Sequence, residues 1–348
     1  MTFTPQKNTS KNTFLSSIIV LLFCFLLCSC SNNEANMILA KQAHNDTISQ
    51  IDSTINQEVL YIPDTNHIPK NKYGNMIRYG KDLFYQTAYL IGPEGVVGKY
   101  AGNKMTCNSC HIDGGTKPFA YSLIKSHARY PQYRAREGKV LSMAERVNNC
   151  LNRPLNGKSL PLDSKEMMGF LSYIQWIGSK APEKVLGDKA LPIKIIDRAA
   201  NPENGRTLYN IHCKRCHQED GSGKLDSSNI SFIYPPLWGN HSYQPGSSMH
   251  RVIMQAKWIK ANMPQDLAKW DKPILTDEEA FDIAAYVNDD KIHPRPNPPT
   301  FDYPNKEEKA IDYDKGPYID NFSEMEHKFG PFQPIIDDWK SKGMNPKY

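Results

Sequence analysis

The sequence predicts a mainly α-helical protein with two domains built on one plan. The pentapeptide Cys-x-x-Cys-His occurs at residues 107–111 and again at residues 213–217. Apolar residues recur at helical spacing before and after each copy, which predicts amphipathic helices on both sides of it. A chain of 348 residues is long enough for two such domains and additional tails.

The repeated pentapeptide indicates covalent attachment of haem. Two thiols at this spacing add across the vinyl groups of one porphyrin, and the adjacent histidine ligates the iron. A single Cys-x-x-Cys pair is also found in redox dithiols and zinc sites, but neither explains a histidine after each pair. We therefore expect two covalently bound haem c groups and their iron. The attachment residues would be Cys107, Cys110, His111, Cys213, Cys216 and His217.

Helices are predicted on both sides of the first pentapeptide. One apolar stripe before it runs through Met76, Tyr79, Leu83, Tyr85 and Leu90. Another stripe after it runs through Met167, Leu171, Ile174 and Ile177. Ser164 is a suitable N-cap for the later helix, and Gly178 is a suitable stop.

The second pentapeptide is flanked in the same way. The segment NPENGRTLYNIH, residues 201–212, leads into it. Thr276 and Glu279 form a predicted capping box at the start of the closing segment TDEEAFDIAAYV. This order of helix, haem motif, loops and closing helix resembles the class I cytochrome c fold, present here twice.

The N-terminal region is typical of an exported protein. Lys7 and Lys11 precede an apolar run at residues 14–27, as in a secretory signal, and the run is short for a membrane span. The run ends in LCSC, which resembles the lipobox of bacterial lipoproteins, so cleavage would precede Cys30 and lipid would be attached there. An ordinary cleaved signal without lipid is the alternative. We expect a periplasmic lipoprotein held at a membrane surface through Cys30.

The net charge and the composition of the remaining segments bear on the partners and on the domain boundaries. The formal net charge of +5 gives no reason to expect a nucleic-acid partner. The proline-rich C-terminal segment contains aromatic residues, so we expect an irregular arm that docks on the surface. The predicted segments are a signal peptide (1–29), a tether (30–70), the first cytochrome c domain (71–180), a linker (181–200), the second cytochrome c domain (201–293) and the C-terminal arm (294–348).

The second haem needs another axial ligand, and Met263 is the candidate. Met263-Pro264 lies between the second pentapeptide and the closing helix, where a class I cytochrome presents its methionine. A thioether ligand raises the reduction potential and suits electron transfer. Met263 could instead be a core residue. The ligand would then be Met249, Met254, His241 or His250.

The first domain contains a different feature, an unpaired cysteine on a predicted helix. Ser142 and Glu145 form a capping box, and Pro154 ends the helix. Its apolar stripe runs through Val140, Ala144, Val147 and Leu151. Arg146 and Cys150 are four residues apart and therefore neighbours on one face.

Further arginines surround this cysteine in the sequence. Arg153 follows it by three residues, and Arg134 and Arg136 lie in the preceding loop. Positive charge favours the thiolate, which is the form that binds a metal or attacks a substrate, and arginine forks bind oxyanions. Alternatively, Cys150 is a small buried apolar residue and the arginines are surface charges or partners of haem propionates.

These features together resemble the dihaem thiosulfate dehydrogenase family over about residues 70–295. The segments that carry the resemblance are YAGNKMTCNSCHIDGG, YPQYRAREG, ERVNNCLNRPLNG, YPPLWG, NMP and EEAFDIAAYV. The resemblance implies oxidation of thiosulfate to tetrathionate, or the reverse, with electrons passed to a small cytochrome c or another periplasmic carrier. It also implies a covalent bond between the Cys150 sulfur and the outer sulfur of the substrate.

The resemblance implies a division of labour between the two haems. The first would be the active-site haem, with His111 and Cys150 as axial ligands and with Arg136 and Arg146 beside the substrate. Arg153 is a further candidate for the site because of its position three residues after Cys150. The second would be the electron exit, ligated by His217 and Met263.

Two positions depart from the family pattern. Asn262 stands where some members have a lysine that competes with the methionine, and this departure resembles the members that reduce tetrathionate well. Pro154 stands where relatives often have serine. Two other functions remain open at this point: a non-catalytic dihaem electron carrier, and a cytochrome that acts on a sulfur group bound to a carrier protein.

Overall fold

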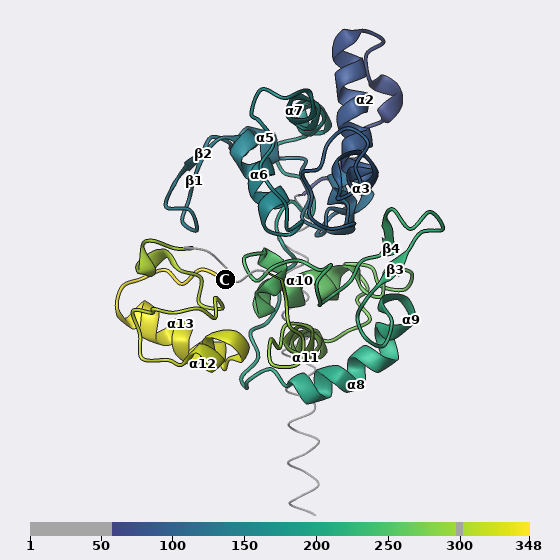
Figure 1. The fold of residues 1–348 in the computed structure, drawn as a ribbon. Helices are drawn as coiled ribbons and strands as arrows, with labels where there is room; N and C mark the ends of the chain where they lie inside the picture. The colour runs from purple at the N-terminus through teal and green to yellow at the C-terminus, as the bar shows by residue number, and fades with distance from the viewer. Residues whose placement is uncertain (1–57, 297–301) are drawn as a thin grey trace, which may run out of the picture. The chain divides into compact units, whose positions relative to one another are not determined.

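The structure is a computed structural model that describes residues 58–296 and 302–348 (Figure 1). The predicted signal peptide, Cys30 and residues 30–57 of the predicted tether lie outside the described residues. Among the described helices, none has both the length and the apolar character needed to cross a bilayer.

The first domain is organised by two helices that cross at close range. α2 (Lys72–Tyr85) precedes the first pentapeptide, and α7 (Lys165–Gly178) follows it (Figure 1). A Cβ atom on Gly80 would lie 1.9 Å from the carbonyl oxygen of Gly169. Glycine is therefore required at this point of α2, because any side chain would separate the two helices.

The second domain repeats this arrangement. α8 (Pro202–His212) and α11 (Asp277–Val287) flank the second pentapeptide and pack on each other. A Cβ atom on Gly205 would lie 1.9 Å from the carbonyl oxygen of Asp282, so the same close crossing occurs here. α10 (Val252–Asn262) packs on α11 and completes the helical core of the domain.

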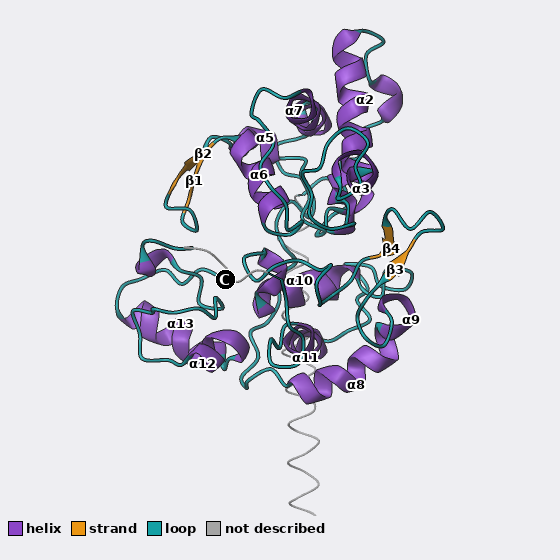
Figure 2. Cartoon of the chain, in the orientation of Figure 1, coloured by secondary structure: helices purple, strands orange, loops and turns teal. Residues whose placement is uncertain are grey.

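The other elements are short (Figure 2). The described part of the predicted tether contains η1 (Thr65–His67). In the first domain the short elements are α3 (Thr87–Ile91), η2 (Cys107–Ser109), α4 (Ile112–Gly115), α5 (Ser126–Arg129), β1 (Gln132–Arg134), β2 (Lys139–Leu141) and α6 (Met143–Asn152). In the second domain they are α9 (Lys214–His217), β3 (Lys224–Leu225), β4 (Phe232–Tyr234) and η3 (Ser248–His250). Within the described residues the strands form two antiparallel hairpins, β1–β2 and β3–β4.

The predicted caps begin the predicted helices. The Ser142 hydroxyl accepts a hydrogen bond from the N–H of Glu145, and the Thr276 hydroxyl accepts one from the N–H of Glu279, each at 3.2 Å. Ser164 caps α7 in the same way. These three helix starts are confirmed, because capping depends on residues close together in the sequence.

Two predicted apolar stripes are partly wrong. Tyr85 ends α2 but is 40% exposed. Leu83 is buried as predicted, and the other buried residues of α2 are Gly74, Ile77, Gly80 and Phe84. Val140 does not belong to a helix: it lies on β2, is 60% exposed and pairs with Tyr133. The strand pairing takes the residues before Ser142, and the helix begins only after this cap.

The end of the predicted tether packs against residues 184–186. The N–H of Val59 donates to the carbonyl oxygen of Lys184 at 3.1 Å, and the N–H of Leu186 donates to that of Val59 at 2.9 Å. Ile68 is buried. The described part of the predicted tether is therefore held by backbone hydrogen bonds and apolar contact.

The C-terminal arm is more regular than its composition predicts. It contains η4 (Lys306–Glu308), α12 (Glu324–Phe329) and α13 (Phe332–Ser341). The expectation of an irregular arm was wrong here, because Ser323 and Glu326 form a capping box that starts α12. The buried aromatic residues of the arm are Tyr303, Tyr313, Phe329, Phe332 and Trp339.

Candidate functional site

Both pentapeptides hold their histidine in the same way. His111 Nδ1 lies 2.6 Å from the carbonyl oxygen of Tyr121, and His217 Nδ1 lies 2.8 Å from that of Pro235. A carbonyl oxygen only accepts hydrogen bonds, so each Nδ1 carries a proton, and Nε2 is the ring atom left to face an iron. Metal-ligating histidines are oriented by such bonds, so the residues present fit two haem irons.

The first pentapeptide lines a cavity of about 280 Å³, which we call the haem 1 cavity. Its lining includes Cys107, Cys110 and His111 from the pentapeptide. It also includes Arg146 and Cys150 from α6. These two residues are one helical turn apart and reach the same cavity, as their spacing predicts.

The Cys150 thiol differs electrostatically from the pentapeptide thiols. Burial raises the pKa of Cys150. The charge of Arg146 and the contact with His111 act in the opposite direction and, with a smaller contribution from Arg153, bring this pKa down to about 7. For comparison, burial raises the pKa of the Cys107 thiol to about 12. The surroundings of Cys150 therefore favour the thiolate.

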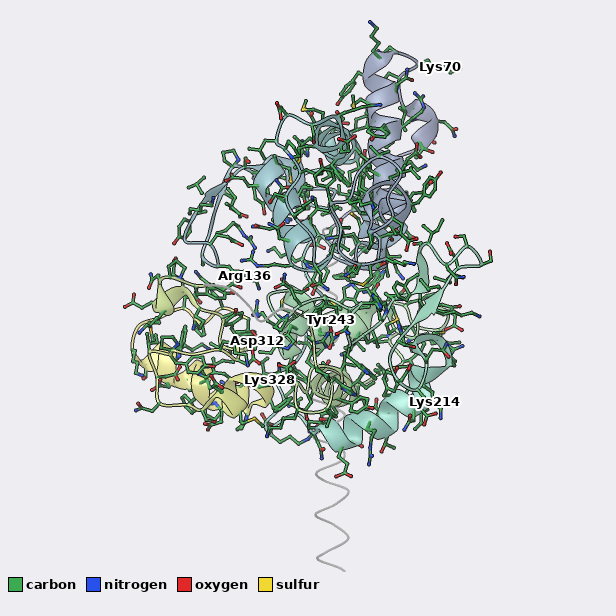
Figure 3. The ribbon with its side chains drawn as sticks, in the orientation of Figure 1. Lys70, Arg136, Lys214, Tyr243, Asp312 and Lys328 are labelled. Atoms are coloured by element: carbon green, nitrogen blue, oxygen red, sulfur yellow. The ribbon has the colours of Figure 1, made fainter. Side chains whose placement is uncertain are left out.

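Two of the predicted arginines are paired with carboxylates. Arg153 donates to Glu137 at 2.6 Å and also pairs with Asp302. Arg136, which is labelled in Figure 3, donates to the carbonyl oxygen of Gly246 at 2.6 Å, and its Nε lies 3.8 Å from Asp302. Both guanidinium groups line the haem 1 cavity but already have anionic neighbours.

Arg146 is placed differently. Within residues 58–296 and 302–348, no carboxylate forms an ion pair with Arg146. Its pKa is raised, first by the charge of the Cys150 thiolate, although burial acts in the opposite direction. Arg134 lines the same cavity and donates to the Gln132 side chain at 3.2 Å. Arg146 is therefore the guanidinium most available to an anion beside Cys150.

The second pentapeptide lines another cavity, of about 400 Å³, which we call the haem 2 cavity. Met263 follows the last residue of α10 and lines this cavity together with His217. Met249 also lines it. Met254, His241 and His250 are not among the described residues that line the haem 2 cavity. Ligation by Met263 stays a prediction, with Met249 as its remaining competitor.

Asn262 is buried next to Met263. Its Nδ2 donates to the carbonyl oxygen of Phe119 at 3.2 Å and to that of Trp258 at 3.0 Å. The first of these bonds links the two domains. The amide therefore serves a domain contact, and Met263 has no lysine competitor at this position.

The two cavities share part of their walls. The residues that line both are Met105, Thr106, Ser109, Cys110 and Met249. The indole N–H of Trp258, from α10, donates to the carbonyl oxygen of Cys110 at 3.2 Å. The two haem sites are therefore neighbours, in direct contact through the first pentapeptide.

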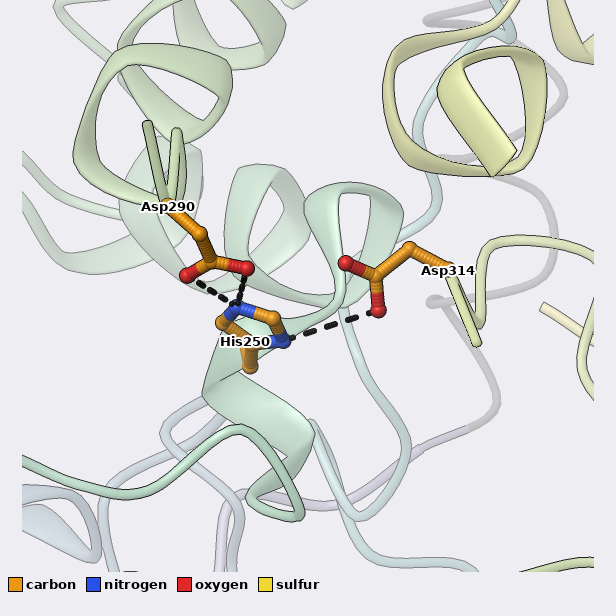
Figure 4. Close-up of side chains that lie close together, drawn as sticks. All are labelled: His250, Asp290 and Asp314. Carbon is orange, nitrogen blue, oxygen red and sulfur yellow. Dashed lines mark hydrogen bonds and ion pairs between the residues drawn. The ribbon is translucent and has the colours of Figure 1, made fainter. Parts of the chain in front are cut away.

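A cluster of ionisable residues lies outside both cavities. The side chains of His250, Asp290 and Asp314 point toward one another (Figure 4). The ammonium nitrogen of Lys328 lies 2.8 Å from His250 Nε2, 2.7 Å from Asp314 and 3.1 Å from Asp290. Because this ammonium group takes the place that a metal ion would need, the cluster is an ion-pair network that attaches the arm.

Sequence reasoning missed the carboxylates of the arginine cluster. Glu137 directly follows Arg136, so an acidic residue inside an arginine-rich segment was the available signal. Asp302 had no such signal, because it lies 149 residues from Arg153 in the sequence. Contacts of this range depend on the docking of the arm.

The two domains match known families. Residues 98–182 match the family described as SoxA/TsdA, cytochrome c domain, and residues 202–290 match the family described as cytochrome c. Each match contains one of the pentapeptides. The chain therefore has two cytochrome c domains with two covalently bound haem c groups.

The chain is also similar to whole proteins. A thiosulfate dehydrogenase from Allochromatium vinosum is 34% identical over 242 residues, which cover 68% of this chain and 84% of the relative. One from Stutzerimonas stutzeri is 32% identical over 243 residues, covering 68% of this chain and 73% of the relative.

A solved structure has the same fold. Thiosulfate dehydrogenase TsdBA from Marichromatium purpuratum, in its as-isolated form, superimposes with a TM-score of 0.59 at 32% identity. The match covers 65% of this chain and 48% of that one, so this chain spans about half its length. The predicted fold of two cytochrome c-like domains is confirmed, and the chain belongs to the thiosulfate dehydrogenase family of c-type cytochromes.

Proposed function

We propose that this protein interconverts thiosulfate and tetrathionate, two thiosulfate ions giving one tetrathionate ion and two electrons. The observation that carries the proposal is the position of Arg146, which has no carboxylate partner among the described residues, next to Cys150 in the haem 1 cavity. The relatives named thiosulfate dehydrogenase support the same reaction. The protein is then an oxidoreductase that acts on sulfur compounds.

The arginines would bring the substrate anions together. Thiosulfate is a dianion, so the approach of a second ion is opposed by charge repulsion, which fixed positive charges in a buried site reduce. Arg146 can donate two parallel hydrogen bonds to a sulfonate group. It lies one helical turn from Cys150, so an anion bound there would have its sulfur close to the thiolate.

The cofactors would be held by residues of both cavities. His111 and Cys150 would ligate the iron of haem 1, and His217 and Met263 would ligate that of haem 2. When bound, the two haems supply one-electron chemistry and together take up the electron pair. The wall shared by the cavities supports haem 2 as the exit toward a small cytochrome c or another periplasmic carrier.

Cys150 would also take part covalently, as the family resemblance implies. Its thiolate and the outer sulfur of thiosulfate form a disulfide bond, and this step releases two electrons. A second thiosulfate ion then attacks the substrate sulfur of that bond, forms tetrathionate and releases the Cys150 thiolate. The lowered pKa of Cys150 supports both the attack and the departure.

The test is the activity of the purified dihaem protein in both directions. Thiosulfate with ferricyanide tests oxidation, and tetrathionate with reduced viologen, without oxygen, tests reduction. We expect turnover in both assays and, because Asn262 replaces the competing lysine, a high rate of tetrathionate reduction. Silence in both assays, with two haems attached, would contradict the proposal and favour a pure electron carrier.

We further propose that the protein is exported and that lipid is attached to Cys30. The signal segment and Cys30 lie outside the described part of the chain. The support is the lipobox-like sequence LCSC after the apolar run. Labelled palmitate should enter the full-length protein in cells and should not enter a Cys30→Ala variant. A fully soluble, unlabelled protein would instead indicate an ordinary cleaved signal.

A further inference from the structure

The C-terminal arm contributes a buried charge to the arginine cluster. Asp302, whose side chain is 1% exposed, pairs with Arg153 and lies 3.8 Å from Arg136. The Tyr313 hydroxyl donates to its other oxygen at 3.1 Å. Asp302 does not line the haem 1 cavity, but both of its arginine partners do. It therefore does not touch a bound anion, and its negative charge acts on the cavity from behind these arginines.

The arm is held in place by contacts with both domains. Asp312 of the arm pairs with Arg251 of the second domain. Lys328 of the arm belongs to the buried ion-pair network with the second domain (Figure 3). On the first domain, the N–H of Tyr303 donates to the carbonyl oxygen of Arg136 at 2.8 Å. Asp302 is thus presented by a docked segment rather than by a loose tail.

The two arginines do not depend on Asp302 alone for their positions. Arg136 keeps its bond to the carbonyl oxygen of Gly246, and Arg153 keeps its bond to Glu137. An uncharged side chain of the same shape at residue 302 would therefore leave the guanidinium groups close to their present places. What it would remove is one negative charge behind the cavity wall.

We propose that Asp302 is the internal counter-ion of the substrate site, through which the C-terminal arm sets the affinity for the substrate anion. Its carboxylate holds Arg136 and Arg153 together in the absence of substrate and competes with the anion for their charge. The inference rests on the proposed function in naming thiosulfate, but the competition applies to any small divalent oxyanion. The arm lies outside the two matched family domains.

The size of the effect follows from its distance. Asp302 is separated from the cavity by one guanidinium group, which places it roughly 8 Å from a bound anion. At that range, with an effective dielectric constant between about 80 and 40, removal of one unit charge changes the affinity for a dianion by about fivefold to thirtyfold. Water and salt reduce the effect, so the lower value is the expectation.

The experiment compares the full dihaem protein with Asp302→Asn and Asp302→Glu. In Asp302→Asn, the KM for thiosulfate should fall about fivefold with a smaller change in kcat, and inhibition by sulfate should tighten by a similar factor. Asp302→Glu keeps the charge and should stay near the wild type. Asp337→Asn is the matched control, because Asp337 is an exposed carboxylate of the same arm and should change neither value.

Anion binding can also be measured without turnover. Sulfate, compared with chloride at equal ionic strength, should raise the melting temperature of oxidised Asp302→Asn more than that of the wild type. If sulfate raises the melting temperature of Asp302→Asn more than that of the wild type, but neither protein turns over thiosulfate, the counter-ion role is upheld and the proposed function is rejected. An unchanged or raised KM and an unchanged sulfate response would overturn the inference. So would failure of both Asp302→Asn and Asp302→Ser to assemble, because Asp302 would then be purely structural.

Discussion

The two haem cavities use the same attachment motif but differ in the residues around it. In both, a pentapeptide histidine is held through Nδ1 by a backbone carbonyl group, so Nε2 is the ring atom left to face an iron. The haem 1 cavity contains Cys150 and four arginines that the sequence places near it. The haem 2 cavity contains Met263 instead, and its Arg215 is paired with Asp266. Two copies of one domain can therefore carry out different chemistry.

Under the proposed function, this difference separates the catalytic cavity from the electron-transfer cavity. A charged, arginine-lined cavity with a thiolate can bind an anion and react with its sulfur. In the haem 2 cavity the candidate ligand is an uncharged thioether, and Arg215 is already paired with Asp266, so this cavity suits a haem that only exchanges electrons. The predictions below test this difference, starting with the largest expected effect.

Replacement of Cys150 removes the feature that distinguishes the haem 1 cavity. Cys150→Gly should retain both haems, because the pentapeptides are intact, but lose about 1000-fold in kcat for thiosulfate oxidation, a loss typical of a missing catalytic nucleophile. Haem content and steady-state rates measure the two expectations. Val147→Ala is a useful control, since Val147 also lines the haem 1 cavity and has no role in the proposed chemistry. Full turnover by Cys150→Gly would reject the assigned role.

The arginines should differ according to their partners. Arg146→Gln should lose about 100-fold in kcat/KM, because a free guanidinium beside the thiolate is removed from a buried site. Arg153→Gln should lose less, because Arg153 is already paired with Glu137 and Asp302. Arg146→Lys should recover only part of the loss, since lysine lacks the planar fork. Equal losses at both positions would contradict this ranking.

The His250 network predicts that the folded state loses stability in acid. Burial and the neighbouring Lys328 lower the pKa of His250 to about 4, and the pKa values of Asp290 and Asp314 are also lowered. Between pH 6.5 and 4 the unfolded chain therefore binds more protons than the folded protein. The free energy of unfolding decreases as the pH is lowered through this window.

The contribution of His250 is about 3 kcal/mol at most, from the difference between its two pKa values. Melting temperatures measured from pH 7 to pH 4 should fall less steeply for His250→Gln than for the wild type. Parallel pH profiles would show that His250 does not carry this dependence.

Replacement of Met263 tests the haem 2 cavity. Met263→Gly should lower the reduction potential of haem 2, because a thioether ligand stabilises the reduced iron, and change steady-state rates by about tenfold or less. Potentiometric titration of the two haems measures the shift. If Met249→Gly lowered the potential of haem 2 and Met263→Gly did not, Met249 would be the ligand.

The sequence predicts those parts of the molecule that depend on local signals. The pentapeptides, the helix caps at Ser142, Ser164 and Thr276, and the shared face of Arg146 and Cys150 all involve residues within a few positions of each other. Val140 was assigned to the wrong element because the pairing of β2 with β1 outweighs helical periodicity. The same limit explains Tyr85, since the buried face of α2 is decided by its crossing with α7.

Long-range contacts could not be predicted from the sequence. The pairing of Asp302 with Arg153 and the bond from Trp258 to Cys110 join residues 149 and 148 positions apart. Such contacts arise from domain packing, and no local pattern encodes them. The arginines could be proposed as site residues from the sequence, because guanidinium groups bind anions. The carboxylates that pair with two of these arginines could not be predicted.

The most direct test of the central claim is the axial ligation of the two haems in the oxidised wild-type protein, measured by near-infrared magnetic circular dichroism. The account predicts one histidine–thiolate haem and one histidine–methionine haem, and in Cys150→Gly the loss of the thiolate signal alone. Two haems with the same ligand set, or a thiolate signal that survives the substitution, would contradict the assignment of catalysis to the haem 1 cavity.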